Sequence, residues 1–134
     1  MSDRKKVLIV EDEGILGSNL REYLRRRGWQ PLLARDGRSA LAAVARFDPA
    51  VILLDYELPD MDGFQVLADI RASRSGCNCI LMTGHTDEAI YTDAPAHGIG
   101  HVLHKPFSLS DMEQRLQDAS LRGAGETGGG DLPS

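Results

Sequence analysis

Short apolar segments recur along the chain, and stretches with a helical spacing of apolar residues lie between them. The apolar segments are three to five residues long, which is the length of a strand and too short for a helix. Most contain almost no polar position, as is typical of parallel strands that are buried on both faces. The pattern predicts five strands, at Lys6–Val10, Pro31–Ala34, Ala50–Leu54, Cys79–Met82 and His101–Leu103.

The first two intervening stretches predict amphipathic helices with recognisable ends. In the first, apolar residues recur at spacings of three and four before Gly28, a candidate C-cap. The second helix is predicted over Gly37–Phe47. Asp36 suits its N-terminus, because an Asp side chain can accept a hydrogen bond from a free backbone N–H there, and Pro49 suits its end.

The other three stretches predict two regular helices and one that is short or distorted. The third begins near Gly63, with Asp62 as its simplest cap, and the fifth follows Ser108, a good N-cap residue. The fourth is predicted to be short or distorted over Asp87–Ala94, because Pro95 would remove a hydrogen bond and clash if the helix continued. Strands and helices alternate, which predicts an α/β fold with a doubly wound, five-stranded parallel sheet and helices on both faces.

The end of the chain differs from the rest in composition. From Gly123 the sequence reads GAGETGGGDLPS, which is glycine-rich and has no apolar periodicity. Such a segment buries too little apolar surface to offset the entropy of ordering it. We expect one domain over residues 5–121 and a flexible tail or linker over residues 122–134, and a length of 134 residues fits one domain.

Charge and cysteine content narrow the classes of function. The formal net charge of -5 at pH 7 argues against direct nucleic-acid binding. No apolar run approaches the roughly 20 residues of a membrane helix, and the charged N-terminus lacks a secretory signal, so we expect a cytoplasmic protein. Cys77 and Cys79 have no further ligands at metal-site spacing and are interpreted as reduced thiols at the start of a strand.

Polar residues follow four of the predicted strands. Because the carboxyl ends of parallel strands share one edge of the sheet, these side chains should converge at the topological switch point. Three crowded carboxylates need a cation, and Mg²⁺ prefers carboxylate oxygens and water. The converging residues are Glu11, Asp12 and Glu13 after the first strand, Asp55 as the first residue beyond the third, Thr83 after the fourth, and His104, Lys105 and Pro106 after the fifth.

This set of groups suits phosphoryl transfer. A carboxylate that contacts a metal ion can act as a nucleophile toward phosphorus. The transfer mainly requires positioning and neutralisation of charge on the phosphoryl oxygens. Mg²⁺, the Lys105 ammonium group and the Thr83 hydroxyl group would supply both.

Four motifs stand in order at the predicted strand ends: VLIVEDE, ILLDYELPDMDG, ILMTGH and HVLHKPF. With them the chain resembles the receiver domains of the response-regulator family of two-component signalling, over about Lys5–Leu121. The resemblance implies a flavodoxin-like (βα)5 fold with strand order 2-1-3-4-5. It also implies Mg²⁺-dependent transfer, with Mn²⁺ as a substitute, from a phosphohistidine on a sensor histidine kinase or histidine phosphotransfer protein. The donor would dock near the first helix.

The resemblance also assigns a role to each matching residue. Asp55 would be the phosphoacceptor and one of the metal ligands. The other ligands would be Asp12 directly, Glu11 mainly through water, and the backbone carbonyl of Glu57. Thr83 would hydrogen-bond the phosphoryl group and move toward it on activation. Lys105 would pair with the phosphate and precede Pro106 through a cis peptide bond. The domain would catalyse only its own phosphorylation and dephosphorylation, so it is expected to be a signalling domain and not an enzyme.

The chain departs from the family pattern in a region expected to bind partners. An aromatic residue usually stands three positions before the lysine, but this chain has Val102 there. Coupling from Thr83 to the face formed by the fourth helix, fifth strand and fifth helix is therefore expected to differ. The resemblance implies a downstream protein target and a dimer through this face, and we expect no output domain in the remaining residues.

His85 lies two residues after Thr83 and should stand at the mouth of the site. We predict that His85 and Glu57 together control how easily water reaches the phosphate, and so the lifetime of the phosphorylated state. The other histidines have no recognised metal-ligand spacing and are interpreted as loop or surface residues.

Three alternatives remain open from the residues alone. A phosphatase of the haloacid dehalogenase type needs a second Asp two residues after its nucleophile, where this chain has Glu57. A flavodoxin-like FMN carrier needs a phosphate loop after the first strand, where the acids of EDEG would repel phosphate. A degenerate receiver that serves only protein contacts would not need the complete set of Glu11, Asp12, Asp55, Thr83 and Lys105.

Overall fold

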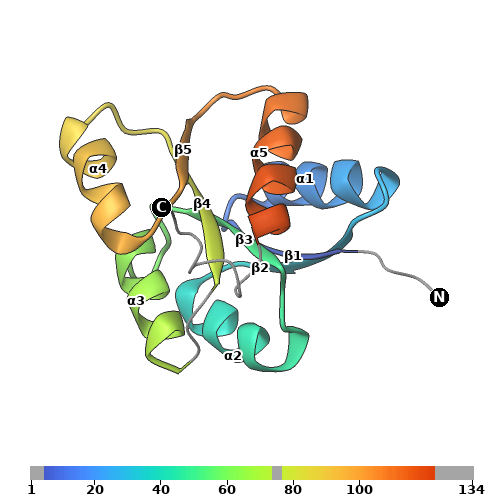
Figure 1. The fold of residues 1–134 in the computed structure, drawn as a ribbon, viewed down its shortest axis with the longest axis horizontal. Helices are drawn as coiled ribbons and strands as arrows, with labels where there is room; N and C mark the ends of the chain where they lie inside the picture. The colour runs from blue at the N-terminus through green and yellow to red at the C-terminus, as the bar shows by residue number, and fades with distance from the viewer. Residues whose placement is uncertain (1–4, 74–76, 123–134) are drawn as a thin grey trace.

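A single parallel sheet carries all five strands of this computed structural model, which describes residues 5–73 and 77–122 (Figure 1). The strand order is β2-β1-β3-β4-β5, as the sequence predicts. The strands are β1 (Lys6–Val10), β2 (Gln30–Ala34), β3 (Val51–Asp55), β4 (Asn78–Thr83) and β5 (His101–His104). The helices are α1 (Gly14–Arg26), α2 (Gly37–Phe47), α3 (Gly63–Ser73), α4 (Glu88–Asp93) and α5 (Leu109–Arg122), and a 3₁₀ turn, η1 (Ala94–His97), follows α4.

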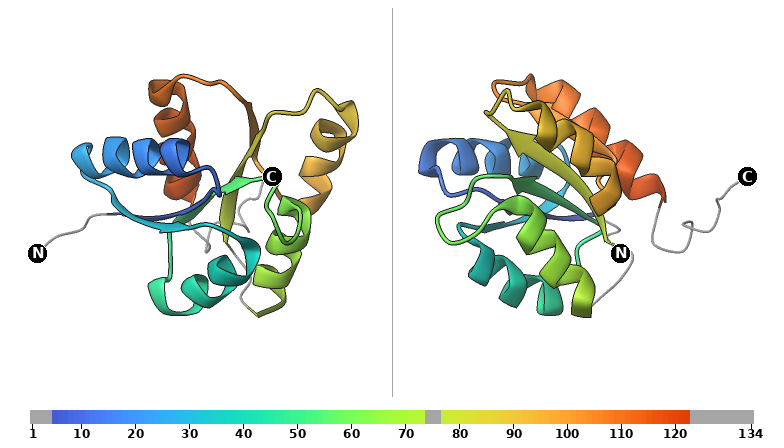
Figure 2. Two further views of the ribbon diagram at one scale, coloured as in Figure 1. Left: turned by 180° about the vertical axis from the view of Figure 1, so that it is seen from behind. Right: turned by 90° about the vertical axis from the view of Figure 1, so that its left-hand side faces the viewer.

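Two hydrophobic cores cover the two faces of the sheet. Alternate strand residues point to opposite faces, so Val7 and Ile9 pack with α1 and α5, whereas Leu8 and Val10 pack with α2, α3 and α4. Figures 1 and 2 show the sheet between these two helical layers. Burial on both sides explains why the strands are apolar at nearly every position.

The helix ends follow the local signals in the sequence. Asp36 accepts a hydrogen bond from the Ser39 amide at 2.7 Å and closes a capping box at the start of α2. The side chains of Asp62 and Ser108 each accept a hydrogen bond from the backbone amide three residues later, at the starts of α3 and α5. These bonds are 2.9 Å and 3.0 Å long. Beyond α1, Gly28 has a positive φ of 95°, which suits a glycine after a helix end.

The fourth helix is short, as Pro95 predicts. The α-helical part ends at Asp93, and Pro95 then occupies an early position in η1, where its missing N–H would not have had a helical partner. The chain therefore turns into a 3₁₀ segment at the proline instead of stopping there.

A buried carboxylate, Glu113, connects α5 to α1 and to the start of β2. Its Oε1 atom accepts hydrogen bonds from Arg27 at 2.8 Å and from Tyr23 at 3.4 Å. Its Oε2 atom accepts from the Trp29 indole N–H at 3.2 Å and from Gln117 at 3.4 Å. Glu113 is only 4% exposed, so these donors replace water around its charge.

Three further expectations concern the rest of the chain. Cys77 and Cys79 are both buried, and they lie just before and within β4, at the start of a strand as predicted. Within the described residues, none of the helices is both long and apolar enough to cross a membrane. Arg122, the first residue of the expected tail, is the last residue of α5, and the rest of that tail lies outside the described residues.

Candidate functional site

The carboxyl ends of β1, β3, β4 and β5 meet at one edge of the sheet and bring together residues far apart in sequence. Glu11 directly follows β1, Asp55 ends β3, Thr83 ends β4, and Lys105 directly follows β5. β1 lies between β2 and β3, so the chain order reverses here, which is where open α/β sheets commonly bind ligands. The predicted convergence of these side chains is confirmed.

Asp55 lies inside the sheet, one residue deeper than the sequence predicts. It is the last residue of β3 and pairs with Met82 of β4, and the next amide, that of Tyr56, still donates to the Met82 carbonyl at 2.8 Å. The expectation that Asp55 is the first residue beyond the strand is therefore wrong. The ladder holds its backbone in extended form, and the residue is only 4% exposed.

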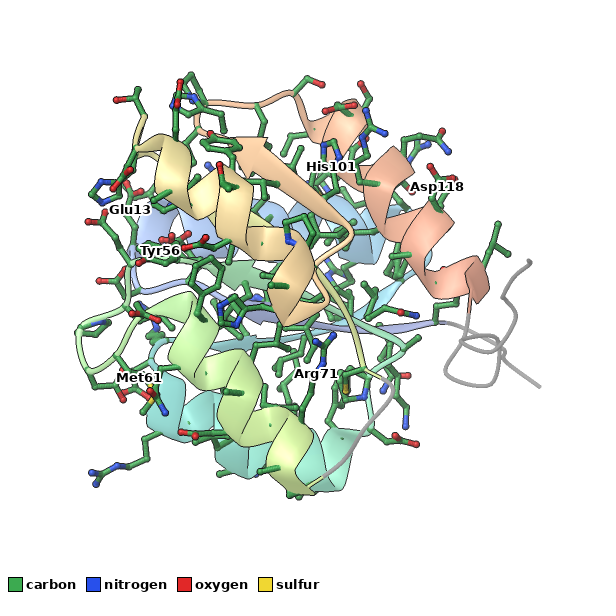
Figure 3. The ribbon with its side chains drawn as sticks, turned by 60° about the vertical axis from the view of Figure 1, so that its left-hand side comes forward. Glu13, Tyr56, Met61, Arg71, His101 and Asp118 are labelled. Atoms are coloured by element: carbon green, nitrogen blue, oxygen red, sulfur yellow. The ribbon has the colours of Figure 1, made fainter. Side chains whose placement is uncertain are left out.

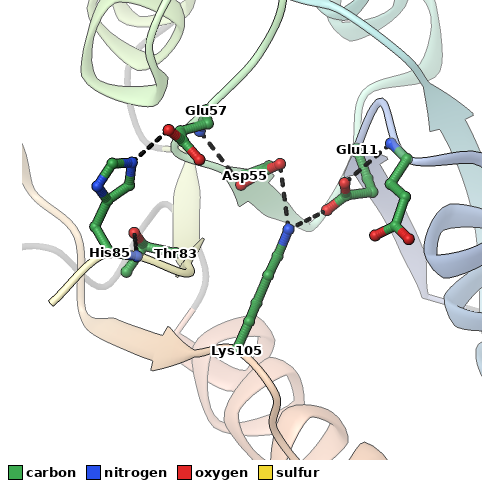
Figure 4. Close-up of polar contacts among 7 residues, drawn as sticks. Glu11, Asp55, Glu57, Thr83, His85 and Lys105 are labelled. Carbon is green, nitrogen blue, oxygen red and sulfur yellow. Dashed lines mark hydrogen bonds and ion pairs between the residues drawn. The ribbon is translucent and has the colours of Figure 1, made fainter.

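Lys105 bridges the two buried carboxylates of the site. Its Nζ atom donates to Glu11 Oε1 at 2.9 Å and lies 3.3 Å from Asp55 Oδ2 (Figure 4). The second Glu11 oxygen accepts the Glu13 amide N–H at 3.1 Å. Glu11 is thus held at both oxygens and is itself 1% exposed, whereas Asp12 is exposed to solvent.

The electrostatics of the site disfavour a charged Asp55. Burial first, and then the neighbouring Glu11 charge, raise the pKa of Asp55 to about 6, although Lys105 acts in the opposite direction. Burial also works against the charge on Lys105, but the hydrogen bond that Lys105 donates to Glu11 and the charge of Asp55 raise its pKa above the usual value. The site thus holds more negative charge than Lys105 can neutralise.

The donor atoms fit a hard divalent cation. Glu11, Asp12 and Asp55 each offer one carboxylate oxygen, and these oxygens all lie within 4.8 Å of one another. Three carboxylates against one ammonium group leave two negative charges when all are ionised. An ion of charge +2 with oxygen ligands, such as Mg²⁺, matches this set in charge and in ligand type.

Thr83, His85 and Glu57 border Asp55 on the side away from Glu11 (Figure 4). The Glu57 amide N–H donates to Asp55 Oδ1 at 3.3 Å, and the fully buried Thr83 accepts the His85 amide N–H on its hydroxyl oxygen at 3.0 Å. The His85 ring contacts the Glu57 carboxylate through Nε2 and Oε2, and both side chains are largely exposed. His85 therefore stands at the mouth of the site, where the sequence places it.

Other predicted site residues also have defined positions. The peptide bond between Lys105 and Pro106 is cis, as the resemblance implies. Val102 is half-buried and packs against the core formed with α2, α3 and α4. The sequence did not indicate that Asp60 contacts α2, because the partner amides are 22 and 23 residues away and no local motif connects them.

The comparisons with known proteins agree with this geometry. A family model described as the response regulator receiver domain matches residues 7–117. The probable transcriptional regulatory protein TcrX of Mycobacterium tuberculosis is 37% identical over 121 residues, which cover 90% of this chain and 51% of that protein. The regulatory protein AtoC of Escherichia coli is 30% identical over 119 residues, which cover 89% of this chain and 26% of that protein.

Solved structures of similar fold include receiver domains as well. The signal receiver domain of a putative LuxO repressor protein from Vibrio parahaemolyticus superposes with a TM-score of 0.83 at 27% identity, covering 89% of this chain and 92% of that one. A receiver domain from Pseudomonas fluorescens gives 0.83 at 26%, covering 91% and 90%. The chain belongs to the response regulator receiver domains of two-component systems, and it spans about half the length of the mycobacterial relatives it matches.

Proposed function

We propose that Asp55 accepts a phosphoryl group, with the help of Mg²⁺, from a phosphohistidine of a sensor histidine kinase or phosphotransfer protein. The main support is the charge at the site, where buried Asp55 lies beside Glu11 and shares one ammonium group with it. A carboxylate in that position favours a nearby cation, and a carboxylate that contacts a metal ion can act as a nucleophile toward phosphorus. Residues 5–121 would form this receiver unit.

In the proposed transfer, one Asp55 carboxylate oxygen attacks the phosphorus atom of the phosphohistidine. A P–O bond forms as the P–N bond breaks. The imidazole nitrogen keeps the electron pair of the broken bond and takes up a proton. The product is an acyl phosphate on Asp55, and no redox partner is needed.

The surrounding groups have separate roles in this proposal. The carboxylates of Asp12, Glu11 and Asp55, with the backbone carbonyl of Glu57, would hold Mg²⁺, or Mn²⁺ in its place. The ion would neutralise charge on the phosphoryl oxygens when bound. Lys105 would move its ammonium group from the carboxylates to the phosphoryl oxygens, a short distance because it already lies between Glu11 and Asp55. The Thr83 hydroxyl accepts the His85 amide N–H, so its proton is free to donate to the phosphoryl group.

A direct test is phosphorylation by a small phosphodonor such as phosphoramidate with Mg²⁺. We expect the parent protein to gain one phosphoryl group by intact-protein mass spectrometry and Asp55→Asn to gain none. Asp118→Asn makes the same chemical change at an exposed position on α5 and should behave like the parent (Figure 3). Equal uptake by Asp55→Asn and the parent would show that another residue is the nucleophile.

A hollow beside the site supports docking of the phosphodonor near α1. Its lining includes Leu16 and exposed Ile15 from α1, Phe107 and Leu109 from the segment after β5, and Lys105 of the site. An exposed apolar residue next to a catalytic lysine suits a transient protein contact that brings a phosphohistidine to Asp55.

The output of the switch would be a change in affinity for a protein partner. Phosphorylation replaces the single carboxylate charge of Asp55 with a phosphoryl group that carries nearly two, and this group would draw Thr83 inward and shift the segment that follows β4. Val102 fills less space than an aromatic side chain at that position, so the signal to the face of α4, β5 and α5 would differ from the usual one. A downstream target or a second copy of the chain would bind this face.

A further inference from the structure

The loop between β3 and α3, residues 56–62, forms one wall of the phosphorylation site and is closed at its base. The Gly63 amide donates to the Tyr56 carbonyl at 2.7 Å, and Glu57 and Asp62 form an isolated antiparallel bridge. Glu57 in this loop also donates its amide to Asp55. The position of the loop therefore sets where the backbone of Glu57 lies relative to the phosphoacceptor.

The far end of this loop is bound to α2 by Asp60. Its Oδ1 atom accepts the Gly37 amide N–H at 2.8 Å, and its Oδ2 atom accepts the Arg38 amide N–H at 3.0 Å. The Gly37 hydrogen bond is the main cause that lowers the pKa of the Asp60 carboxyl group, so it is charged at neutral pH. A carboxylate at a helix N-terminus is further stabilised by the helix dipole.

Met61 adds a close apolar contact to the same helix end. A Cβ atom built on Gly37 would lie 2.6 Å from Met61 Cγ and 2.7 Å from its Sδ, so any other residue at position 37 would require the Met61 side chain to move. Figure 3 shows Met61 beside the first turn of α2. Two adjacent loop residues thus bind the same helix end by independent interactions, one electrostatic and one by packing.

Asp36 and Asp60 bind different backbone amides at the start of α2. Asp36 already binds the Ser39 amide, and the Ala40 amide donates to the Asp36 carbonyl at 3.1 Å. Asp60 takes the two remaining amides, those of Gly37 and Arg38. Asp36 caps α2 from within its own segment, whereas Asp60 ties α2 to the wall of the site.

We propose that Asp60 is a positioning residue of the phosphorylation site, which acts by anchoring the β3–α3 loop to α2 and so holding Glu57 against Asp55. This inference rests on the function proposed above. Loss of the anchor leaves every side chain of the site in place but lets the loop backbone move. Metal binding and phosphorylation should then weaken, because the loop that carries the Glu57 backbone has lost its attachment to α2.

The test compares Asp60→Ala with Asp36→Ala. Both variants remove a carboxylate cap from the same end of the same helix, and only the first releases the loop. Three readouts apply to the full chain: Mg²⁺ binding by calorimetry, amide hydrogen exchange of Glu57 and Gly63 without metal, and the rate of phosphorylation by phosphoramidate. Asp60→Asn is a second variant, which keeps one acceptor oxygen and should give intermediate values.

We expect Asp60→Ala to weaken Mg²⁺ binding by about three- to tenfold, below the usual effect of a group that directly supports a metal ligand. It should also speed exchange at both loop amides and slow phosphorylation. Asp36→Ala should lower the melting temperature similarly and leave all three readouts at parent values. If both variants give equal Mg²⁺ affinity and loop exchange, the anchor has no positioning role. A parent that neither binds Mg²⁺ nor takes up phosphate would instead overturn the proposed function.

Discussion

Asp55 and Glu113 are equally buried carboxylates with very different surroundings. Each residue is 4% exposed. Glu113 receives hydrogen bonds from four side chains, of which the Arg27 bond is 2.8 Å long. Asp55 has the Lys105 ammonium and the Glu57 amide, both at 3.3 Å, and it shares Lys105 with the neighbouring Glu11 charge.

The number of donors around each carboxylate distinguishes Glu113, which has a structural role, from Asp55, which is reactive. The donors around Glu113 offset the cost of removing its charge from water, so this side chain holds α1, the start of β2 and α5 together. The surroundings of Asp55 do not offset that cost, and its pKa is raised to about 6. A bound cation would therefore stabilise the charged form of Asp55.

The largest expected effect on stability is at Glu113. Glu113→Ala leaves the buried Trp29 indole N–H without its acceptor and removes the partner of Arg27, so we expect a loss of about 3 kcal/mol in the free energy of unfolding, measured with urea. Glu22→Ala is the matched control, because the partly exposed Glu22 also accepts hydrogen bonds from two arginines. The control should change stability little, and an equal loss in both variants would contradict the comparison.

Asp55→Asn should change the stability in the opposite direction from Glu113→Ala. In chelator at pH 7, we expect it to stabilise the protein by about 2 kcal/mol, because the amide carries no charge to bury or to repel Glu11. Thermal unfolding of the variant and the parent measures this. A destabilised Asp55→Asn would show that Lys105 already compensates the Asp55 charge in full.

The pH dependence of that difference has a defined direction. A carboxyl group whose pKa is raised on folding binds more protons in the folded state, so its contribution to stability falls as pH rises through the range from 3.8 to about 6. Asp55→Asn and the parent should have similar stability below pH 4 and differ fully above pH 6. Urea titrations at several pH values test this, and a gap that does not vary with pH would exclude the raised pKa as its cause.

Metal binding should offset the unfavourable burial of the Asp55 charge and leave the surroundings of Glu113 unchanged. At a Mg²⁺ concentration ten times its dissociation constant, we expect the parent to gain about 1.4 kcal/mol of stability. Asp55→Asn should gain much less, because one ligand oxygen has lost its charge. Glu113→Ala should gain as much as the parent, and thermal unfolding with and without Mg²⁺ distinguishes the three proteins.

The smallest expected effect is kinetic and concerns the mouth of the site. His85→Ala removes the contact between His85 and Glu57, which should admit water and speed loss of phosphate from Asp55 roughly threefold, less than 1 kcal/mol of barrier. His104→Ala replaces another exposed histidine, at the end of β5, and serves as the control. A dephosphorylation rate unchanged by His85→Ala would show that His85 does not control the lifetime of phosphorylated Asp55.

Much of the fold could be predicted because its signals are local. Apolar runs buried on both faces locate the strands to within a residue or so, and Asp36, Asp62 and Ser108 mark helix starts through hydrogen bonds that span only three residues. The polar residues at strand ends could be grouped as one site, since parallel strands place their carboxyl ends together.

Only the tertiary structure decided how those groups interact. It placed Asp55 inside β3, gave Glu113 partners 84 to 90 residues away, and joined Asp60 to α2. The sequence by itself determined the sheet, the helix caps and the set of charged residues at the site, because periodicity and capping act within one element. Burial and hydrogen bonding between elements depend on packing in three dimensions, and they decide which buried carboxylate is compensated and which is left reactive.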